Sequence, residues 1–254
     1  MASASGVLVK FLVYDRSGKV ADSLRSLLPQ VNRGTNQLTI DILPYSSDKD
    51  LAQVIRENSI DAIISPGNSY GFLNGGFDAA ISSYYSGEVS GGNISITAND
   101  ITLCLQDVLL EKMGGYNPVS HALVVNMSDA LKSFPKTMEA AGQLKNSIPQ
   151  LIHTPTMALP TVIPPGSRVI FDCMWNIICS IKQNNVVSET KINRVLLPGL
   201  GTGVGRVSAD SCASQVVTAL QYFNKAESAK SSDEYEKTYI DAANMDRDIS
   251  KSAQ

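Results

Sequence analysis

The chain has 254 residues, of which 43% are hydrophobic and 18% charged, and its formal net charge at pH 7 is −3. This composition is typical of a globular protein of one or two domains, and the charge gives no bulk attraction to nucleic acid or to anionic membranes. No apolar run approaches the roughly 20 residues that cross a bilayer, and the first residues lack the basic and apolar regions of a secretory signal, so we expect the cytoplasm or the nucleus.

Six apolar runs predict β-strands, and helical patterns lie between them. The strands are expected at Val7–Tyr14, Leu38–Tyr45, Ile60–Ser65, His121–Asn126, Leu151–Leu159 and Val195–Leu197. The helices are expected at Val20–Leu28, Lys49–Glu57, Ile101–Met113, Arg168–Lys182 and Ser208–Phe223. Strands that alternate with helices predict a three-layer α/β/α fold with a mixed, mostly parallel central sheet. In such sheets, ligands bind outside the carboxyl ends of the strands.

Helix caps and a polar C-terminal segment complete the expected organisation. Asp100 and Ser167 precede apolar helical patterns and are the predicted N-caps. Residues 86–98 are rich in turn formers and predict a surface insertion. Beyond Asn224 the chain has no strong apolar stripe, so we expect one domain over residues 1–224 and a polar tail over residues 225–254.

The cysteines and histidines do not form a recognisable metal or catalytic motif. The cysteines are Cys104, Cys173, Cys179 and Cys212, with no C-x-x-C spacing between them. Most lie in apolar helical patterns, where a free thiol packs as a small hydrophobe. The histidines, His121 and His153, begin or interrupt apolar runs, which favours packed imidazoles, although a Ser-His-Asp arrangement stays open. We therefore expect no metal and no cofactor.

The most informative segment is Pro198-Gly-Leu-Gly-Thr-Gly-Val-Gly205, between a predicted strand and a predicted helix. Its alternating glycines leave no Cβ atoms between a ligand and the backbone amides. Such amides, reinforced by the positive end of the following helix, suit a phosphate or a diphosphate. The segment therefore predicts a phosphate-binding loop.

A second glycine-rich loop lies upstream, within residues 61–81. Its Pro66-Gly67 pair forces a turn that presents Asn68 at the end of a strand. Asn-Gly-Gly at residues 74–76 then allows close backbone approach, and Asp78 opens a helix. Taken singly, Asn68 can serve only the amides of its own turn, and Asp78 can be a helix N-terminal acid, worth about 0.3–1 kcal/mol.

Taken together, the two loops resemble the macro domain family. The pattern Asp-Ala-Ile-Ile-x-Pro-x-Asn, followed by x-Gly-Gly-Phe-Asp-x-Ala-Ile, is similar to that family's signature, and residues 200–205 look like its other ligand loop. The resemblance extends from about Leu38 to Phe223. It implies a mixed, mostly parallel sheet between helices, with ADP-ribose held in a surface cleft. Some family members bind ADP-ribosylated protein, some hydrolyse ADP-ribosyl esters, and some remove the phosphate of ADP-ribose 1″-phosphate, a by-product of tRNA splicing.

The resemblance also implies roles for individual residues. Asn68 aligns with the asparagine that contacts the distal ribose, and Asp78 with the acid implicated in catalysis by some hydrolase members. The backbone contacts near the distal ribose and phosphate correspond to Gly75, Gly76 and Phe77, with Pro66, Gly67 and Asn74 beside them. The diphosphate loop corresponds to Gly201, Thr202, Gly203, Val204 and Gly205. Asp48 is the nearest candidate for the acid that reads the adenine amino group.

The chain departs from the family pattern in the first loop. Ser65 replaces the first asparagine of the Asn-x-x-Asn element, and Leu73-Asn74 occupies the first positions of the glycine run. Ser82 stands where some ester-hydrolysing members carry a histidine. These departures are compatible with binding and argue against mono-ADP-ribosyl hydrolysis.

We therefore expect the protein to bind ADP-ribose or ADP-ribose 1″-phosphate and to hydrolyse the phosphate ester of the latter. In this hypothesis Asp78 orients or deprotonates water, Asn68 fixes the ribose, and loop amides receive the developing negative charge. A non-catalytic reader of free or protein-linked ADP-ribose and an ester hydrolase remain alternatives. An S-adenosylmethionine-dependent methyltransferase is a remote one, because its glycine loop would follow the first strand. A dinucleotide motif fails at Val204 and Arg206.

Overall fold

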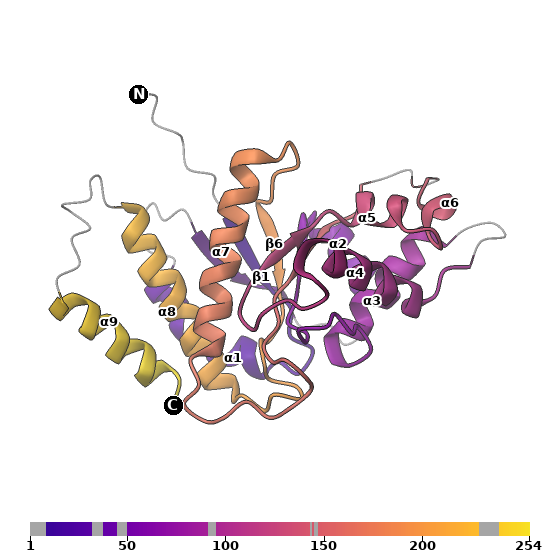
Figure 1. The fold of residues 1–254 in the computed structure, drawn as a ribbon. Coiled ribbons are helices and arrows are strands. Elements are labelled where there is room, and N and C mark those ends of the chain that lie inside the picture. The colour runs from indigo at the N-terminus through magenta and orange to yellow at the C-terminus, as the bar shows by residue number, and fades with distance from the viewer. Residues whose placement is uncertain are drawn as a thin grey trace.

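The computed structural model describes residues 9–31, 38–44, 50–90, 95–142, 144, 147–228 and 239–254. Within them, a six-stranded sheet has the order β2-β1-β6-β3-β5-β4 (Figure 1). The strands are β1 (Val9–Val13), β2 (Leu38–Ile42), β3 (Ala62–Ser65), β4 (Leu123–Val125), β5 (Gln150–His153) and β6 (Arg194–Leu197). Only β4 and β5 pair antiparallel among these strands. The expected α/β fold with a mixed, mostly parallel sheet is confirmed.

Helices cover both faces of the sheet (Figure 1). They are α1 (Lys19–Val31), α2 (Leu51–Asn58), α3 (Gly76–Val89), α4 (Ala98–Met113), α5 (Met127–Ser133), α6 (Met138–Ala141), α7 (Val169–Val187), α8 (Ala209–Ser228) and α9 (Tyr239–Ser252). Phe11 and Val13 pack among side chains of α1, α7 and α8, whereas Leu12 packs among those of α2 to α6. Because neighbouring strand residues point to opposite faces, this alternation makes the three layers.

Local packing corrects the predicted helix starts. The N-cap of α4 is Thr97: its Oγ1 accepts the Asp100 amide at 3.2 Å, and Asp100 Oδ2 accepts the Thr97 amide at 3.0 Å. Asp100, the predicted cap, is thus the partner in a capping box. At α7, Arg168 occupies the N-cap position and its side chain makes no capping bond, while Ser167 Oγ accepts the Val169 amide at 3.3 Å. The predicted insertion at 86–98 is also helical at first, since α3 extends to Val89.

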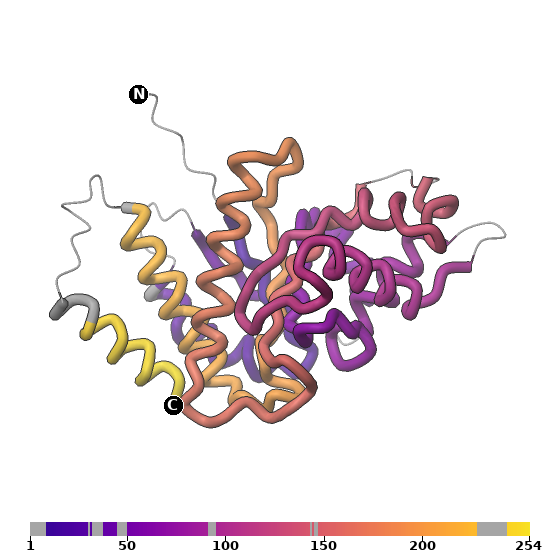
Figure 2. Tube along the Cα trace, in the orientation of Figure 1, coloured from indigo at the N-terminus to yellow at the C-terminus, as the bar shows by residue number. Residues whose placement is uncertain are grey.

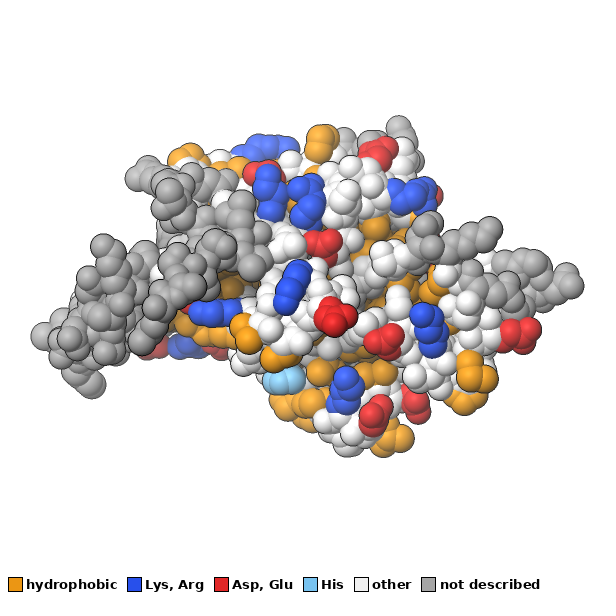
Figure 3. All heavy atoms as spheres, turned by 90° about the horizontal axis from the view of Figure 1, so that it is seen from above, with side chains coloured by type: hydrophobic (Ala, Val, Ile, Leu, Met, Phe, Trp, Pro, Cys, Tyr) orange, Lys and Arg blue, Asp and Glu red, His pale blue; other side chains and the backbone are white. Residues whose placement is uncertain are grey.

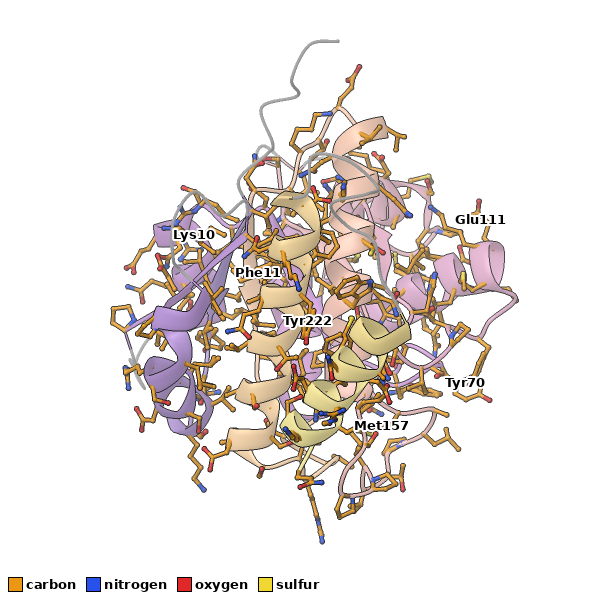
Figure 4. All side chains as sticks on the ribbon, turned by 90° about the vertical axis from the view of Figure 1, so that its left-hand side faces the viewer. Lys10, Phe11, Tyr70, Glu111, Met157 and Tyr222 are labelled. Atoms are coloured by element: carbon orange, nitrogen blue, oxygen red, sulfur yellow. The ribbon has the colours of Figure 1, made fainter. Side chains whose placement is uncertain are left out.

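The C-terminal helix α9 packs along α8 (Figures 1 and 2). Its Ile249 is only 2% exposed and belongs to the apolar cluster of α7 and α8. Arg168 Nη1 lies 2.8 Å from Asp246 Oδ1, and the Tyr222 hydroxyl donates to Asp248 Oδ2 at 2.8 Å. Tyr222 is seen beside α9 in Figure 4. The boundary between a domain and a tail at residue 224 stays a prediction.

The sheet order explains where a cleft can form. The parallel strands β1, β6, β3 and β5 are neighbours, so their carboxyl ends lie along one edge. The chain leaves β6 toward α8 on one face but leaves β3 toward α3 on the other. Because adjacent loops diverge here, this edge is a topological switch point, where α/β sheets bind ligands. In Figure 4, Met157 lies beyond this edge and Lys10 near the strand starts.

The opposite end of the molecule presents a mixed surface. Viewed from above, where the parallel strands begin, acidic and basic side chains are interspersed (Figure 3). Among the residues that the structure describes, no helix is both long enough and apolar enough for a transmembrane span.

Candidate functional site

A cleft of about 620 Å³ lies at the switch point, within the usual range for small-molecule sites. Both glycine-rich loops line it, so the structure brings together two segments that are far apart in sequence. The predicted residues in its wall are Pro66, Gly67, Asn68, Asn74, Gly75, Gly76, Phe77, Asp78, Gly201, Thr202, Gly203, Val204 and Gly205. Asp48, the remaining candidate, lies outside the described residues.

Sequence reasoning missed two further walls of the cleft. One is the loop after β1, with Tyr14, Asp15, Arg16 and Ser17, and the other is the loop after β5, with Thr156, Met157 and Pro160. The sequence could have indicated these loops, because the predicted parallel strands end at the same edge of the sheet and their loops meet there. It could not indicate the order of the strands, which decides which loops are neighbours.

The loop after β3 runs beside the loop after β5 and is bonded to it. Thr156 Oγ1 donates to the Pro66 carbonyl at 3.0 Å, and the Thr156 amide donates to the Gly67 carbonyl at 3.1 Å. The Ser69 amide donates to the Met157 carbonyl at 3.2 Å. These bonds continue the parallel pairing beyond the strands and fix this wall.

The glycines of the loop after β6 serve two different purposes. Gly201 has φ +67°, and a Cβ there would lie 2.9 Å from Ile163 and from Ile170. A Cβ on Gly205 would lie 2.5 Å from the Gly201 carbonyl oxygen. Both positions therefore need glycine for folding. Gly203 is exposed on the cleft wall, with no atom within 4 Å of its Cβ position, so it leaves room for a ligand.

The helix N-terminus in the cleft wall is that of α3, not that of α8. The lining of this loop ends at Gly205, whereas α8 begins at Ala209. Gly75 is the N-cap of α3 and offers no side-chain capping bond. The first amides of a helix have no intrahelical partner and carry its positive end. The start of α3 is therefore a place where the cleft can accommodate negative charge.

Asp78 lies in the first turn of α3 and is only 8% exposed. Its Oδ1 accepts the Ser65 hydroxyl at 2.9 Å. Burial raises the pKa of the carboxyl from 3.8 to about 7, although the Ser65 hydrogen bond acts to lower it. A carboxyl group with such a pKa can accept a proton near neutral pH.

Ser65 also lies 3.4 Å from Nδ1 of His153, and both residues are fully buried. Burial lowers the pKa of His153 to about 4, so the imidazole is neutral. Asp78, Ser65 and His153 therefore bring together the three residue types of a Ser-His-Asp triad. The sequence analysis had left such an arrangement open. Their order differs from a triad, because the serine lies between the other two and does not line the cleft.

Asn68 is 6% exposed and uses its amide group within its own loop. Its Oδ1 accepts the Tyr70 amide at 3.1 Å and the Phe72 amide at 3.3 Å, and its Nδ2 donates to the Phe72 carbonyl at 3.1 Å. Asn68 thus binds the amides of its own turn, which was one of the two roles considered for it from the sequence. Because an amide has two donor hydrogens, one remains for a ligand.

The loop after β1 adds an aromatic pair and a cation. The Tyr14 and Phe77 rings lie 5.7 Å apart, tilted by 43°. Asp15 caps α1, since its carboxylate accepts the Val20 amide at 2.7 Å and the Ser17 amide at 2.9 Å. Exposed Arg16 is the one cationic side chain among the described lining residues. The described lining of the cleft thus combines apolar surface, the amides at the start of α3 and one exposed positive charge.

These features define a three-layer α/β domain with an anion-accepting cleft of nucleotide size at its switch point. Residues 34–100 match the family model described as a macro-like domain. The matched segment includes Asn68 and Asp78 and ends before the loop at 198–205. The match covers 67 of the 254 residues, so this segment is similar to a macro-like domain, and the observed sheet and its helices are consistent with that fold. The similarity suggests ADP-ribose-type ligands in general.

Proposed function

We propose that the protein binds ADP-ribose 1″-phosphate in this cleft and hydrolyses its phosphate ester to ADP-ribose and inorganic phosphate. The observation that supports it most is a nearly buried carboxyl group with a pKa of about 7 beside the uncapped N-terminus of α3. The amides at the helix start would hold the phosphate, and the carboxylate would act on water.

In the proposed reaction, Asp78 takes a proton from a water molecule as the water oxygen attacks phosphorus. The bond between phosphorus and the ribose oxygen breaks, its electron pair stays on that oxygen, and the oxygen takes up a proton from solvent water. Asp78 then releases its own proton to solvent. The amides of Gly76 and Phe77 stabilise the negative charge that develops on the phosphoryl oxygens. Asn68 contributes its remaining Nδ2 hydrogen to the ribose.

The test measures phosphate release from ADP-ribose 1″-phosphate by the full chain and by Asp78→Asn, which keeps size and removes the base. We expect a loss of about 100-fold or more in kcat, the usual contribution of a general base. Ser82→Ala is the matched control, because Ser82 is buried in the same helix and its hydroxyl bonds only to the carbonyls of Leu73 and Ala79. Equal rates for Asp78→Asn and the unaltered chain would refute the assignment.

A non-catalytic ADP-ribose reader is the second candidate, favoured by Ser82, which stands where some ester-hydrolysing members carry a histidine and whose hydroxyl donates to the carbonyls of Leu73 and Ala79. Calorimetry with ADP-ribose, together with incubation with mono-ADP-ribosylated protein, separates the candidates. Binding without release of phosphate or of protein-linked ADP-ribose would establish the reader.

A further inference from the structure

Ser65 and His153 end two neighbouring strands at the same level of the sheet. They are paired in the register of β3 with β5, so their side chains lie next to each other beneath the cleft. Asp78 descends onto them from α3, with its Oδ1 2.9 Å from Ser65 Oγ. Gly67 covers the group: a Cβ there would lie 2.7 Å from Asp78 Oδ2 and 3.5 Å from both Ser65 Oγ and His153 Cε1.

Hydrogen-bond counting fixes the direction of the bonds when Asp78 is ionised. A serine has one hydroxyl hydrogen, and Ser65 donates it to Asp78 Oδ1. The Ser65 oxygen can then only accept from His153, which requires the imidazole hydrogen to be on Nδ1. His153 Nε2 is buried and makes no hydrogen bond of normal geometry in the described part of the chain. The Asn68 backbone near the imidazole acts to raise the pKa of His153, although burial outweighs it, so the assignment of the hydrogen to Nδ1 rests on the bond with Ser65.

We propose that Ser65 and His153 are positioning residues for Asp78: the imidazole Nδ1–H holds the Ser65 hydroxyl toward Asp78 Oδ1, which leaves Oδ2 as the oxygen that takes a proton from water. The proton-transfer step rests on the proposed function, whereas the hydrogen-bonded arrangement does not. The Ser65 hydroxyl and the neutral His153 imidazole each have one hydrogen to donate. The imidazole gives its hydrogen to the Ser65 oxygen, and this bond orients the hydroxyl toward Asp78.

Few charged groups surround this arrangement. Among the described residues, no lysine or arginine hydrogen-bonds or forms an ion pair with Asp78, Ser65 or His153. His121 is the other titratable group that acts on His153, and Asp15 and Arg16 line the same cleft. Ser65 is therefore the side chain that stabilises the ionised form of Asp78, in addition to the helix start.

The experiment follows the Asp78 carboxyl carbon by ¹³C NMR as a function of pH in the free, full-length protein. In Ser65→Ala the midpoint should rise by roughly half a unit to one unit, the equivalent of one lost hydrogen bond. His153→Leu should also raise it. His153→Asn should restore the original midpoint, because the Asn Nδ2–H can replace the imidazole Nδ1–H. Ser82→Ala is the control, because Ser82 is also a buried serine but its hydroxyl donates to the carbonyls of Leu73 and Ala79 and not to Asp78.

The outcomes separate this proposal from the proposed function. Equal Asp78 midpoints in Ser65→Ala and Ser82→Ala, or equal midpoints in His153→Asn and His153→Leu, overturn the positioning role whatever the activity. If His153→Leu does not fold, the two serine variants decide. Where phosphate release occurs, the acid limb of kcat/KM should move by the same amount as the NMR midpoint in Ser65→Ala. A shifted midpoint without catalysis supports the arrangement and removes only the reaction.

Discussion

Opposing effects act on the carboxyl group of Asp78. A position in the first turn of a helix and a hydroxyl donor both favour the ionised form, yet removal from water is the larger effect and raises the pKa to about 7. This balance distinguishes a helix-capping acid, which stays ionised at the surface, from a group that can exchange a proton near neutral pH. Ionisation of Asp78 therefore also lowers the free energy of unfolding.

That cost predicts a pH-dependent gain in stability for Asp78→Asn. Because the folded-state pKa is raised from 3.8 to about 7, the folded state holds a proton that the unfolded chain has released, and stability falls as pH rises through this interval. From these values the group removes about 3 kcal/mol between pH 5 and pH 8. Denaturant unfolding should show Asp78→Asn gaining on the unaltered protein over that interval. A constant difference at all pH values would contradict the raised pKa.

Residue-level reasoning from sequence found part of this site. Asn68, Asp78 and the glycines were found because their types and spacing in one loop are informative without a fold. Ser65 and His153 were not, because their meeting depends on the register of β3 with β5, and the residues are 88 positions apart. In the sequence, Ser65 was only a departure from the Asn-x-x-Asn element. Its contact with His153 becomes visible once β3 is paired with β5.

At the scale of elements, the apolar runs predicted the strands because burial imposes their periodicity, whereas helix ends depend on side-chain bonds. Asp100 was predicted as a cap, but the helix begins earlier: Thr97 is the N-cap, and its side chain accepts the amide of Asp100. The phosphate loop was assigned to the positive end of α8, yet the loop is long enough to keep that helix out of the wall. The uncapped start of α3 provides that charge instead.

Two glycines of the loop after β6 make a matched test of its role. Gly201→Ala should destabilise the protein by about 1–3 kcal/mol, because the residue has a positive φ and its methyl would press on Ile163 and Ile170. Gly203→Ala should change stability by less than about 0.5 kcal/mol. The Gly203 methyl should nevertheless weaken ADP-ribose binding about tenfold, which is 1.4 kcal/mol. Thermal unfolding and calorimetry measure both effects, and unchanged affinity in Gly203→Ala would place the ligand away from this loop.

For the whole molecule, the order of the strands determines the site. Insertion of β6 between β1 and β3 brings residues 198–205 next to residues 66–78. Alternation of strands and helices predicts the class of fold but not this order, because each crossover is compatible with several neighbours. The same long-range packing gives the C-terminal segment its place. Its sequence is polar, and within the described part Met245 packs on the core while Ile249 and Ala253 are buried.

The last prediction asks whether residues 239–254 unfold with the rest of the chain. Ile249 is 2% exposed against the cluster of α7 and α8, so Ile249→Ala should lower the free energy of unfolding by about 2–4 kcal/mol. Exposed Ser250, whose hydroxyl bonds only within α9, provides the control Ser250→Ala. If the helix were a loosely attached tail, both variants would leave the main denaturant transition in place. A lower midpoint for Ile249→Ala alone, with a single transition, would show that α9 folds cooperatively with the helices whose loops form the cleft.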